Sequence, residues 1–228
     1  MDAFFHELHT YLRRSLYHVN PQGKWRSPAK TYERMPAIAL PSPSPSRSLD
    51  EVLLSRSSAQ SGTAEGILSL RECGTLFGMS MGRSSGSSRT YPSAGALYPI
   101  ETYIIGRIEG YSDEDSVFHY DPHRHMLEHL WVLAPFSRDD LLKGETPSHS
   151  HLVVFTSVWG RSAAKYGSVA YNHVLIEMGH MSQNALLVAT SLNLKSRPLS
   201  GFADEKIARV LDIDPRHETP IHVITLSP

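Results

Sequence analysis

The sequence predicts an α+β fold built around one hydrophobic core, and three observations support this prediction. The chain has 228 residues, of which 40% are hydrophobic and 20% charged, enough for an ordinary globular core. Short β-rich runs gather in the middle of the chain, and segments with helical spacing flank them. We therefore expect an N-terminal helix and arm over residues 1–47, followed by one main domain over residues 48–228.

The N-terminal part is predicted as a helix and an extended arm. Residues 3–17 carry apolar side chains at helical spacing, typical of a short amphipathic helix. Residues 20–48 are rich in Pro and Ser, and proline cannot donate a backbone hydrogen bond. Ser48 then resembles an N-cap, so a helix is expected directly after it, with Leu49, Val52 and Leu53 on its buried face.

The main domain continues with a helix over about Ala64–Phe77, and the glycine-rich stretch 74–88 is predicted as a loop. Apolar or alternating runs predict strands over residues 100–108, 117–122, 125–133, 152–160 and 220–226. The second and third of these strands form a hairpin that turns at Asp121 and Pro122. A long, mostly buried helix is expected to begin near Tyr166, and a short one over residues 205–213.

Charge and cysteine content exclude several functional classes. The chain has 22 Lys+Arg and 23 Asp+Glu, and it contains no long basic run, which disfavours nucleic acid as a partner. Its one cysteine, Cys73, cannot form a disulfide within the chain, which favours a cytoplasmic location. The N-terminus lacks a signal-peptide pattern, and no apolar run approaches the length of a membrane span.

No metal site is predicted, although the chain contains 13 histidines. His6, Glu7 and His9 miss the HExxH spacing by one residue. The group at positions 123, 125 and 129 falls on a predicted hairpin, where alternation sends side chains to different faces, so solvent-exposed histidines are expected. Cys73 has no evident base nearby in sequence and is expected to be a small buried hydrophobe.

Three segments together indicate a binding site. The first segment directly follows the helix expected after Ser48, and its guanidinium, hydroxyl and amide groups could surround a phosphate. The segment PSAGALYP, residues 92–99, has small side chains that allow close approach of a flat ring system, and PLSGF, residues 198–202, is a second tight glycine turn. Each segment alone is more often an ordinary surface arginine or a turn. The first segment consists of Arg56, Ser57, Ser58 and Gln60.

Four stretches of the chain resemble a known family. They are RTYPSAGALYPIETYII, the earlier KWRSPAKTYERMPAIALP, the pair Lys165 and Tyr166, and LIEMGHMSQNALLVATSLNL. Together they resemble the SagB-type dehydrogenases, which are flavin enzymes of the nitroreductase-like superfamily. These enzymes are azoline oxidases in the biosynthesis of thiazole/oxazole-modified microcins. The resemblance implies a central, mostly antiparallel sheet flanked by helices, with FMN bound at a homodimer interface.

The resemblance also assigns cofactor-binding residues. Arg56 and Ser58 match the phosphate segment, but Gln60 replaces a common basic residue, and Arg89 could supply the missing charge. A second set matches the segment against the flavin ring and ribityl chain, although Ala96 replaces the Asn of many nitroreductases. This second set is Pro92, Ser93, Ala94 and Gly95. Pro198, Ser200 and Gly201 match the loop that faces the reactive edge of the flavin.

Lys165 and Tyr166 match the Lys-Tyr pair that handles protons in the family's dehydrogenases. Conversion of an azoline to an azole removes a proton from the ring α-carbon and a hydride from the adjacent carbon. Flavin can accept the hydride and pass electrons to oxygen. A phenolate stabilised by a neighbouring ammonium group is a suitable base, so Tyr166 is expected as the base and Lys165 as its electrostatic helper.

The resemblance further implies a precursor peptide as substrate and a synthetase complex as partner. The complex would contain a YcaO-type cyclodehydratase and an E1-like, leader-binding subunit. Two alternatives remain open at this stage. One is an NAD(P)H-dependent, nitroreductase-like oxidoreductase, and the other is a subunit without flavin that serves as a scaffold for the cyclodehydratase.

Overall fold

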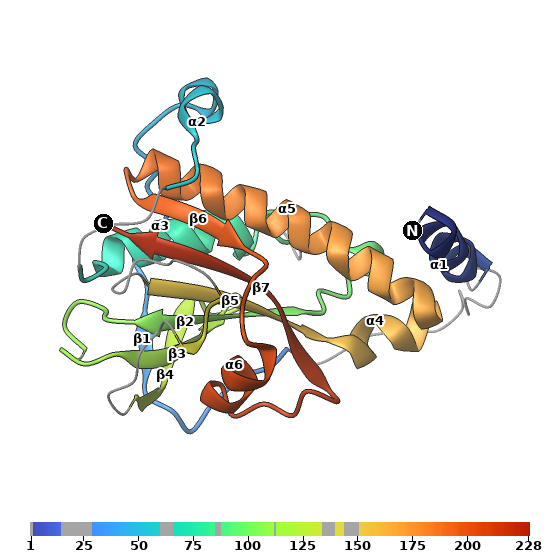
Figure 1. Ribbon diagram of the computed structural model, residues 1–228. Helices are drawn as coiled ribbons and strands as arrows, with labels where there is room; N and C mark the ends of the chain where they lie inside the picture. Colours follow the sequence, from blue (N-terminus) through green and yellow to red (C-terminus); the bar gives the residue numbers. More distant parts are fainter. Residues whose placement is uncertain are drawn as a thin grey trace.

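The protein is built around a seven-stranded sheet with strand order β1-β4-β3-β2-β5-β7-β6, in which every pairing is antiparallel. The computed structural model describes residues 2–14, 29–59, 66–84, 88–111, 113–133, 140–143 and 151–228. Helices flank the sheet (Figure 1). The α+β class and the antiparallel sheet are therefore confirmed.

The central strands are buried on both faces, which explains their nearly continuous apolar sequences. The strands are β1 Ala37–Ala39, β2 Ile100–Gly106, β3 Ser116–Asp121, β4 Met126–Val132, β5 His151–Val158, β6 Lys195–Leu199 and β7 Glu218–Ser227. The predicted hairpin is present as β3 and β4. Asp121 ends β3, and its side chain accepts hydrogen bonds from the backbone N–H groups of His123 and Arg124, which stabilises the turn.

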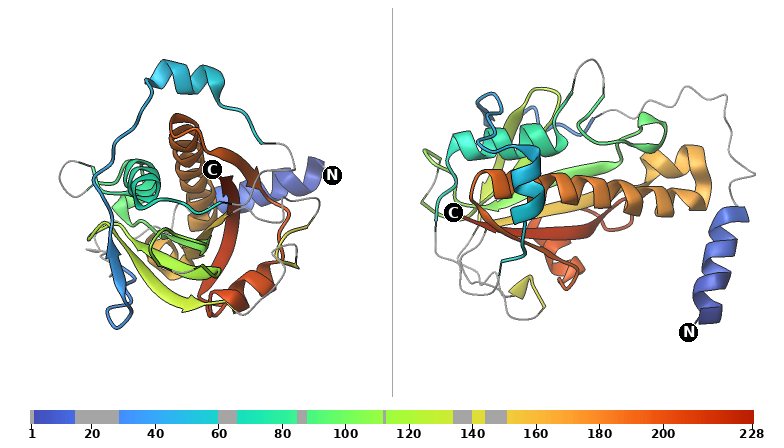
Figure 2. Two further views of the ribbon diagram at one scale, coloured as in Figure 1. Left: turned by 90° about the vertical axis from the view of Figure 1, so that its left-hand side faces the viewer. Right: turned by 90° about the horizontal axis from the view of Figure 1, so that it is seen from above.

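Two hydrophobic clusters lie on the two faces of the sheet. Helices α3 and α5 cover one face, where Phe77 and Met181 belong to the same buried cluster as Phe155 of β5. Helix α6 covers the other face, where Ile207 packs in the cluster of Tyr103 (Figure 2). The helices are α1 Asp2–Arg14, α2 Leu49–Ser55, α3 Leu70–Met81, α4 Trp159–Tyr166, α5 Ala170–Ser191 and α6 Asp204–Val210.

Helix α3 corrects the prediction of a helix over Ala64–Phe77 and a loop from Gly74. The helix begins at Leu70, after the N-cap Ser69, and continues to Met81. Gly74 and Gly78 lie inside it because the arm crosses the helix there. A methyl group at Gly74 would overlap the carbonyl oxygen of Pro41. The glycines therefore permit close packing rather than a loop.

The arm takes part in the sheet. Residues 37–39 form β1, which pairs with β4, and Ile38 lies in the main core cluster. Farther along, Ser48 and Glu51 form the expected capping arrangement at the start of α2. Of the three residues expected on the buried face of α2, only Val52 is buried. The prediction was wrong for Leu49 and Leu53, which are exposed because α2 stands away from the sheet.

The segment after β5 also differs from the prediction. The strand ends at Val158, and residues 159–166 form the separate helix α4. A short 3-10 turn, η4 Gly167–Val169, then leads into α5 at Ala170, where the long helix was expected from Tyr166. Gly167 has a φ angle of +56°, a conformation that favours glycine and that ends α4. Lys165 and Tyr166 therefore lie at the end of α4.

Helix α1 confirms the predicted N-terminal helix and lies beside η4, apart from the sheet (Figures 1 and 2). Its large side chains Phe4, Phe5 and Tyr11 are exposed. None of the helices in the described ranges combines the length and the apolar character that crossing a bilayer would require.

Candidate active site

The loop between Pro92 and Pro99 has an unusual backbone. Gly95, Ala96 and Tyr98 have φ angles of +65°, +54° and +46°. Residues other than glycine rarely adopt such φ angles, and backbone strain of this kind is concentrated at functional sites. The loop is held internally, because the Tyr98 N–H donates to Ser93 Oγ at 3.0 Å and the Ala96 N–H donates to the Ser93 carbonyl at 3.0 Å.

Lys165 and Tyr166 lie against this loop at Gly95. A Cβ atom at position 95 would lie 2.7 Å from Tyr166 Oη and 2.8 Å from Lys165 Nζ. Lys165 Nζ also lies 5.2 Å from the centroid of the Tyr166 ring. Glycine is therefore favoured at this position by its φ angle, and a larger residue would displace the ends of the Lys165 and Tyr166 side chains. The structure thus brings the predicted ring-facing segment together with the predicted Lys-Tyr pair.

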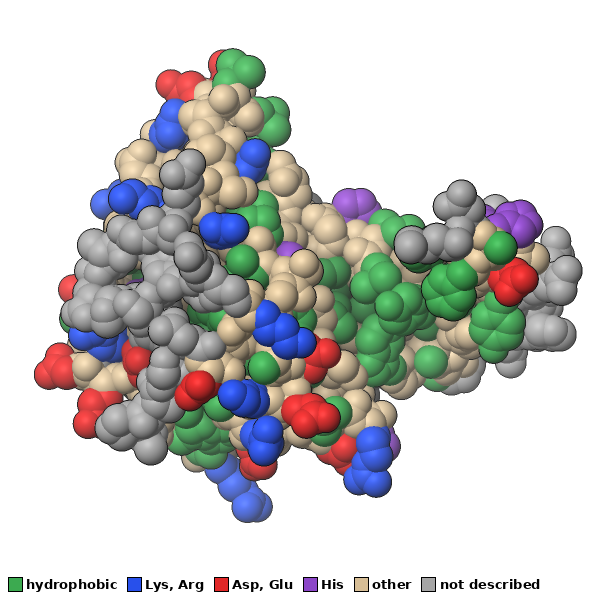
Figure 3. All heavy atoms as spheres, in the orientation of Figure 1, with side chains coloured by type: hydrophobic (Ala, Val, Ile, Leu, Met, Phe, Trp, Pro, Cys, Tyr) green, Lys and Arg blue, Asp and Glu red, His purple; other side chains and the backbone are tan. Residues whose placement is uncertain are grey.

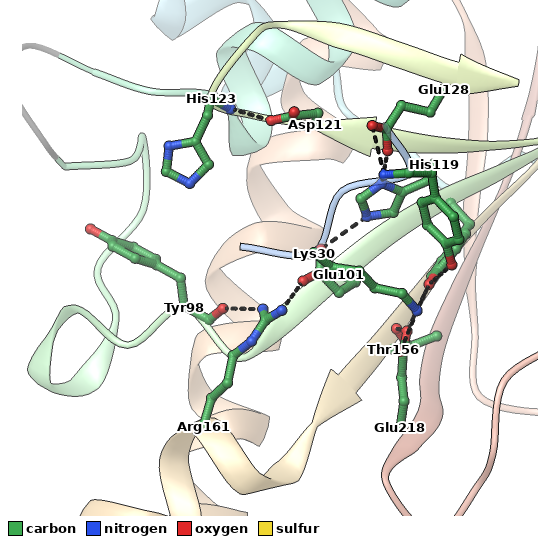
Figure 4. A network of polar contacts seen from close by, with 12 residues as sticks. Lys30, Tyr98, Glu101, His119, Asp121, His123, Glu128, Thr156, Arg161 and Glu218 are labelled. Carbon is green, nitrogen blue, oxygen red and sulfur yellow. Dashed lines mark hydrogen bonds and ion pairs between the residues drawn. The ribbon is translucent and has the colours of Figure 1, made fainter. Parts of the chain in front are cut away.

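A buried polar network fixes α4 relative to the loop (Figure 4). Arg161 lies one turn before Lys165 on α4, and it donates to the Tyr98 carbonyl at 3.1 Å and forms an ion pair with Glu101 of β2. Glu101 contacts His119 Nε2 at 3.0 Å, and His119 Nδ1 contacts Glu128 at 2.8 Å. Because these side chains come from three neighbouring strands, the sheet register sets the position of α4.

The charges of this network compensate one another. Burial by itself would raise the pKa of Glu101, but hydrogen bonding to His119 and the charge of Arg161 hold it at about 2. Burial would lower the pKa of His119, but its two carboxylate partners raise it above the ordinary value of 6.5. Glu101 is therefore ionised at neutral pH, and the protonated form of His119 is favoured between the two carboxylates.

Arg89 belongs to the same end of the molecule. Its Nη1 donates to Tyr91 Oη at 2.8 Å, and its guanidinium lies 4.6 Å from the centroid of the Tyr98 ring. Ser93 donates from Oγ to Glu177 Oε2 of α5 at 2.6 Å. The predicted residues Arg89, Pro92, Ser93, Ala94 and Gly95 thus form one group with Lys165 and Tyr166, which we call the loop group.

The other predicted residues form a second group beside β6. Arg56, Ser57 and Ser58 follow α2, and the next residue, Ala59, donates its N–H to the Ser196 carbonyl at 2.8 Å. Pro198 lies in β6, and Ser200 and Gly201 follow it, with the Gly201 carbonyl accepting from the Lys143 N–H at 2.9 Å. We call these six residues the β6 group. Gln60 lies outside the described residues.

The loop group and the segment that leads into α2 lie at different ends of α5. Ser93 contacts α5 at Glu177, whereas Ser46, just before α2, contacts the carbonyl of Ser191 at the other end of the helix. From Glu177 to Ser191 an α-helix rises about 21 Å. Within one protomer, the segment before α2 and the loop group therefore adjoin α5 at points far apart along its axis.

Several residues of the site could not be identified from sequence motifs. Glu101 and His119 stand inside the predicted strands IETYIIG and SVFHYD, and a charged or titratable residue between apolar neighbours was the available signal. Arg161 and Glu177 carried no comparable signal. Lys30 of the arm and Glu218 of β7 form a neighbouring ion pair with a distance of 2.5 Å, to which Tyr103 also contributes.

The histidines do not form a metal centre in the described parts of the chain, where no group of three or more His, Cys, Asp or Glu residues is arranged to hold an ion. The prediction of unpacked histidines was wrong for His125 and His129. His125 contacts the Pro41 carbonyl at 3.0 Å, and the His129 ring packs on Phe118. Cys73 is fully buried as predicted, and burial raises the pKa of its thiol.

The fold superposes on a solved nitroreductase structure from Ralstonia eutropha with a TM-score of 0.71, at 21% identity, over 84% of this chain and 88% of that one. The chain itself belongs to the nitroreductase family of oxidoreductases, whose sequence pattern matches residues 59–226.

The chain is similar to a protein that processes a microcin. It is 33% identical over 142 residues to the microcin B17-processing protein McbC of Escherichia coli, a match that covers 59% of this chain and 52% of McbC. It thus spans about half the length of that relative.

Two other solved structures are informative. The E. coli microcin synthetase McbBCD complex with truncated pro-MccB17 bound contains a chain that superposes with a TM-score of 0.67, at 25% identity, over 99% of this chain and 92% of that one. A nitroreductase from Exiguobacterium sibiricum in complex with FMN has a TM-score of 0.55 at 14% identity, over 82% of this chain and 90% of that one.

Proposed function

We propose that this protein is an FMN-dependent dehydrogenase that oxidises thiazoline or oxazoline rings in a ribosomally made peptide. The observation that carries the proposal is the placement of Lys165 and Tyr166 against Gly95 of the strained loop. A base and a cation next to a loop with close backbone approach suit the removal of a proton beside a flat ring. The similarity to McbC favours peptide-borne azolines as substrate.

The residues present fit an FMN cofactor. Members of the family generally bind FMN, and the two groups offer a guanidinium, hydroxyl groups and two glycine-containing turns, which suit a phosphate and a flat ring. The β6 group would hold the cofactor's phosphate through Arg56, Ser57 and Ser58. Its other residues, Pro198, Ser200 and Gly201, would lie near the reactive edge of the flavin. Residues 92–95 would contact the ring and ribityl chain.

Because Arg56, Ser57 and Ser58 follow a helix that adjoins the end of α5 farther from the loop group, we propose that the two groups meet across a homodimer. A two-fold axis would bring the β6 group of one protomer to the loop group of its partner, giving two identical sites. Exposed apolar side chains support this arrangement, since Leu54 of α2 and Ile176 of α5 are 89% and 51% exposed in a single protomer.

The reaction removes two hydrogen nuclei and two electrons from the azoline ring. Tyr166, as phenolate, takes the proton from the ring α-carbon, and the Lys165 ammonium stabilises the phenolate before that transfer. The adjacent carbon loses hydride, and a carbon–carbon double bond completes the aromatic ring. FMN, when bound, supplies the hydride acceptor and passes the electrons to oxygen. Arg161 keeps α4, and with it the Lys-Tyr pair, against the loop.

The first prediction tests this assignment. Lys165→Ala and Tyr166→Phe are each expected to retain FMN but to slow azole formation by about 10²- to 10⁴-fold, as expected for a positioned acid–base group. The two losses should not add, because a base and the charge that stabilises it act as one unit. The measurement is the loss of about two mass units per ring on a cyclised peptide, the mass of a hydride plus a proton.

Matched controls are Lys206→Ala and Tyr111→Phe, which change the same side chains outside both groups. Near wild-type rates in the Lys165 and Tyr166 variants would remove the pair from the mechanism. Consumption of NAD(P)H in place of azoline oxidation would support a nitroreductase activity instead. A purified protein without flavin absorption would support the scaffold role.

We further propose that the protein works in a synthetase complex on a precursor peptide. Its partners would be a YcaO-type cyclodehydratase, which forms the azolines, and an E1-like, leader-binding subunit. The superposition on a chain of the McbBCD complex over nearly the whole sequence supports this proposal.

A further inference from the structure

The strained loop depends on one buried carboxyl group. Ser93 Oγ accepts from the Tyr98 N–H and donates to Glu177 Oε2, so it links the end of the loop to helix α5. Glu177 is only 3% exposed, and its Oε1 has no hydrogen-bond partner among the described residues. A buried carboxyl with one free oxygen is costly, so its presence behind the loop requires an explanation.

The next titratable residue toward the start of α5 faces the same site. His173 lies one turn before Glu177, and its ring packs edge-on against Tyr166, with 4.7 Å between ring centroids. Residues four apart lie on one face of a helix. One face of α5 therefore contacts the site twice, with His173 behind Tyr166 and Glu177 behind Ser93.

We propose that Glu177 is a positioning residue of the active site: through Ser93, its carboxyl group holds residues 93–98 in the conformation that places Gly95 against Lys165 and Tyr166. The loop contains three residues with positive φ angles, a conformation that persists only where the surroundings enforce it. The Ser93 hydroxyl provides that constraint from inside the loop, and Glu177 fixes the hydroxyl. The catalytic part of this inference rests on the proposed function.

The titration of Glu177 makes this role measurable. Burial raises the pKa of Glu177 to about 7, against the hydrogen bond from Ser93 and the charge of Arg89, which lower it. Tyr91 also interacts electrostatically with Glu177, and His173 lies one turn away on the same helix. An ionised carboxylate accepts a stronger hydrogen bond than a neutral acid. A loop opening that leaves Glu177 buried breaks only the hydrogen bond from Ser93, which lowers the pKa of the carboxyl group. Against that local opening, the loop should be held more tightly as the pH rises through 7.

The first experiment does not depend on catalysis. In protein labelled with ¹³C at the glutamate carboxyl carbons, one resonance is expected to titrate near pH 7 and to be absent in Glu177→Gln. Ser93→Ala should move that titration to higher pH, because it removes the hydrogen bond to the carboxylate. A titration unaffected by Ser93→Ala, or the absence of any glutamate that titrates above pH 6, would overturn the proposal.

The second experiment measures the loop itself. Hydrogen exchange of the peptide containing Tyr98, corrected for the intrinsic pH dependence, is expected to slow between pH 6 and pH 8 in the wild type. Glu177→Gln keeps an oxygen acceptor but cannot ionise, so this change should disappear, and Ser93→Ala should exchange faster at both pH values. Glu205→Gln, an exposed residue of α6, is the matched control. Equal pH responses in wild type and Glu177→Gln would contradict the proposal.

The catalytic readout separates this inference from the proposed function. Glu177→Gln is expected to lower kcat at pH 8 by about tenfold, the typical difference between charged and neutral hydrogen bonds, and to remove an inflection near pH 7. An unchanged inflection in Glu177→Gln would contradict the positioning role. If the wild type oxidises no azoline, the proposed function fails, while resonance titration and hydrogen exchange still decide the role of Glu177. Ser93→Ala leaves the buried carboxyl intact and serves if Glu177→Gln does not fold.

Discussion

At the scale of single residues, the central strands contain charged groups where apolar ones would fold more simply. Burying an ion pair costs about as much desolvation as its attraction returns, so such a pair is weak evidence for stability. In this sheet, however, Glu101 joins His119 to Arg161, and Arg161 joins the network to the loop. The network therefore has a positional consequence, which is the placement of Lys165 and Tyr166.

The pKa shifts of this network predict a maximum of stability in mildly acidic solution. The pKa of Glu101 is lowered from 4.5 to about 2, so its contribution is present above pH 4.5 and is lost as the pH falls toward 2. The pKa of His119 is raised above 6.5, so its contribution is complete below pH 6.5 and is lost as the pH rises through the folded-state value. The free energy of unfolding should therefore decline on both sides of about pH 4.5–6.5.

Glu101→Gln tests this prediction. It leaves two buried cations with a missing partner, so the free energy of unfolding at pH 6 should fall by about 3 kcal/mol. The loss of stability toward pH 3 should also become less steep than in the wild type. Denaturant titrations at pH 3, 6 and 8 measure both effects, with Glu205→Gln as the exposed control. A parallel shift with unchanged pH dependence would show that Glu101 is not the titrating group.

Sequence reasoning identified the residues of this site only where a local motif carried them. PSAGALYP and the adjacent Lys165 and Tyr166 are short continuous strings, and the structure places them together. Glu177 could not be found in this way because its partner Ser93 lies 84 positions away in the chain. Only the packing of α5 against the loop joins them, and a single sequence does not contain that information.

At the scale of elements, the packing of α3 depends on its glycines. The arm passes over the helix at Gly74 and Gly78, where a Cβ at position 78 would lie 2.5 Å from Pro43 and 2.9 Å from His125. His125 in turn contacts the Pro41 carbonyl, so the arm, α3 and the β3–β4 turn are joined at one place. The helix accepts two residues of low helix propensity in return for this contact.

Gly74→Ala should consequently destabilise the fold, although alanine is the better helix former. The new methyl group would meet backbone rather than a flexible side chain, and such overpacking typically costs about 1–3 kcal/mol. Gly160→Ala in α4 is the matched control, because no atom lies within 4 Å of its Cβ position and up to about 1 kcal/mol of stabilisation is expected. Denaturant midpoints of the two variants should therefore move in opposite directions. A stabilising effect at position 74 would mean that the arm does not pack as described.

The elements that sequence patterns predicted correctly are the long or strongly patterned ones. β2, β5 and β7 are rich in apolar and β-branched residues, and α5 keeps helical spacing over 22 residues. β1 and β6 were missed, since one has three residues and the other contains Pro198. The end of α3 was misplaced because glycine inside a helix has the same local signature as a loop. In each failure, contacts with distant segments outweighed local preference.

At the scale of the whole molecule, apolar side chains remain uncovered in one protomer. Figure 3 shows hydrophobic side chains on the right-hand part of the molecule, where Figure 1 places α4, the start of α5 and α1. Tyr171, Leu175 and Ile176 of α5 are exposed, as are Leu49, Leu53 and Leu54 of α2. These helices contact each other, and the two sets adjoin opposite ends of α5. A two-fold partner that covered both sets would also bring the β6 group of one protomer to the loop group of the other.

The last prediction follows from this shared site. Arg56→Ala should weaken FMN retention, because a hydrogen bond to a charged phosphate contributes about 1.5–3 kcal/mol, and Lys165→Ala should abolish turnover. If each site takes its β6 group from one protomer and its loop group from the other, a heterodimer of the two variants contains one site without either substitution. Random pairing should then restore activity to about a quarter of all sites at limiting FMN. The measurement is azole formation by co-expressed, differently tagged variants.

Mixing Lys165→Ala with Tyr166→Phe is the control, because both changes fall in the loop group and every site stays defective. Recovery in the first mixture and none in the second is expected. Failure of both mixtures, with dimers present, would show that each protomer builds its own site.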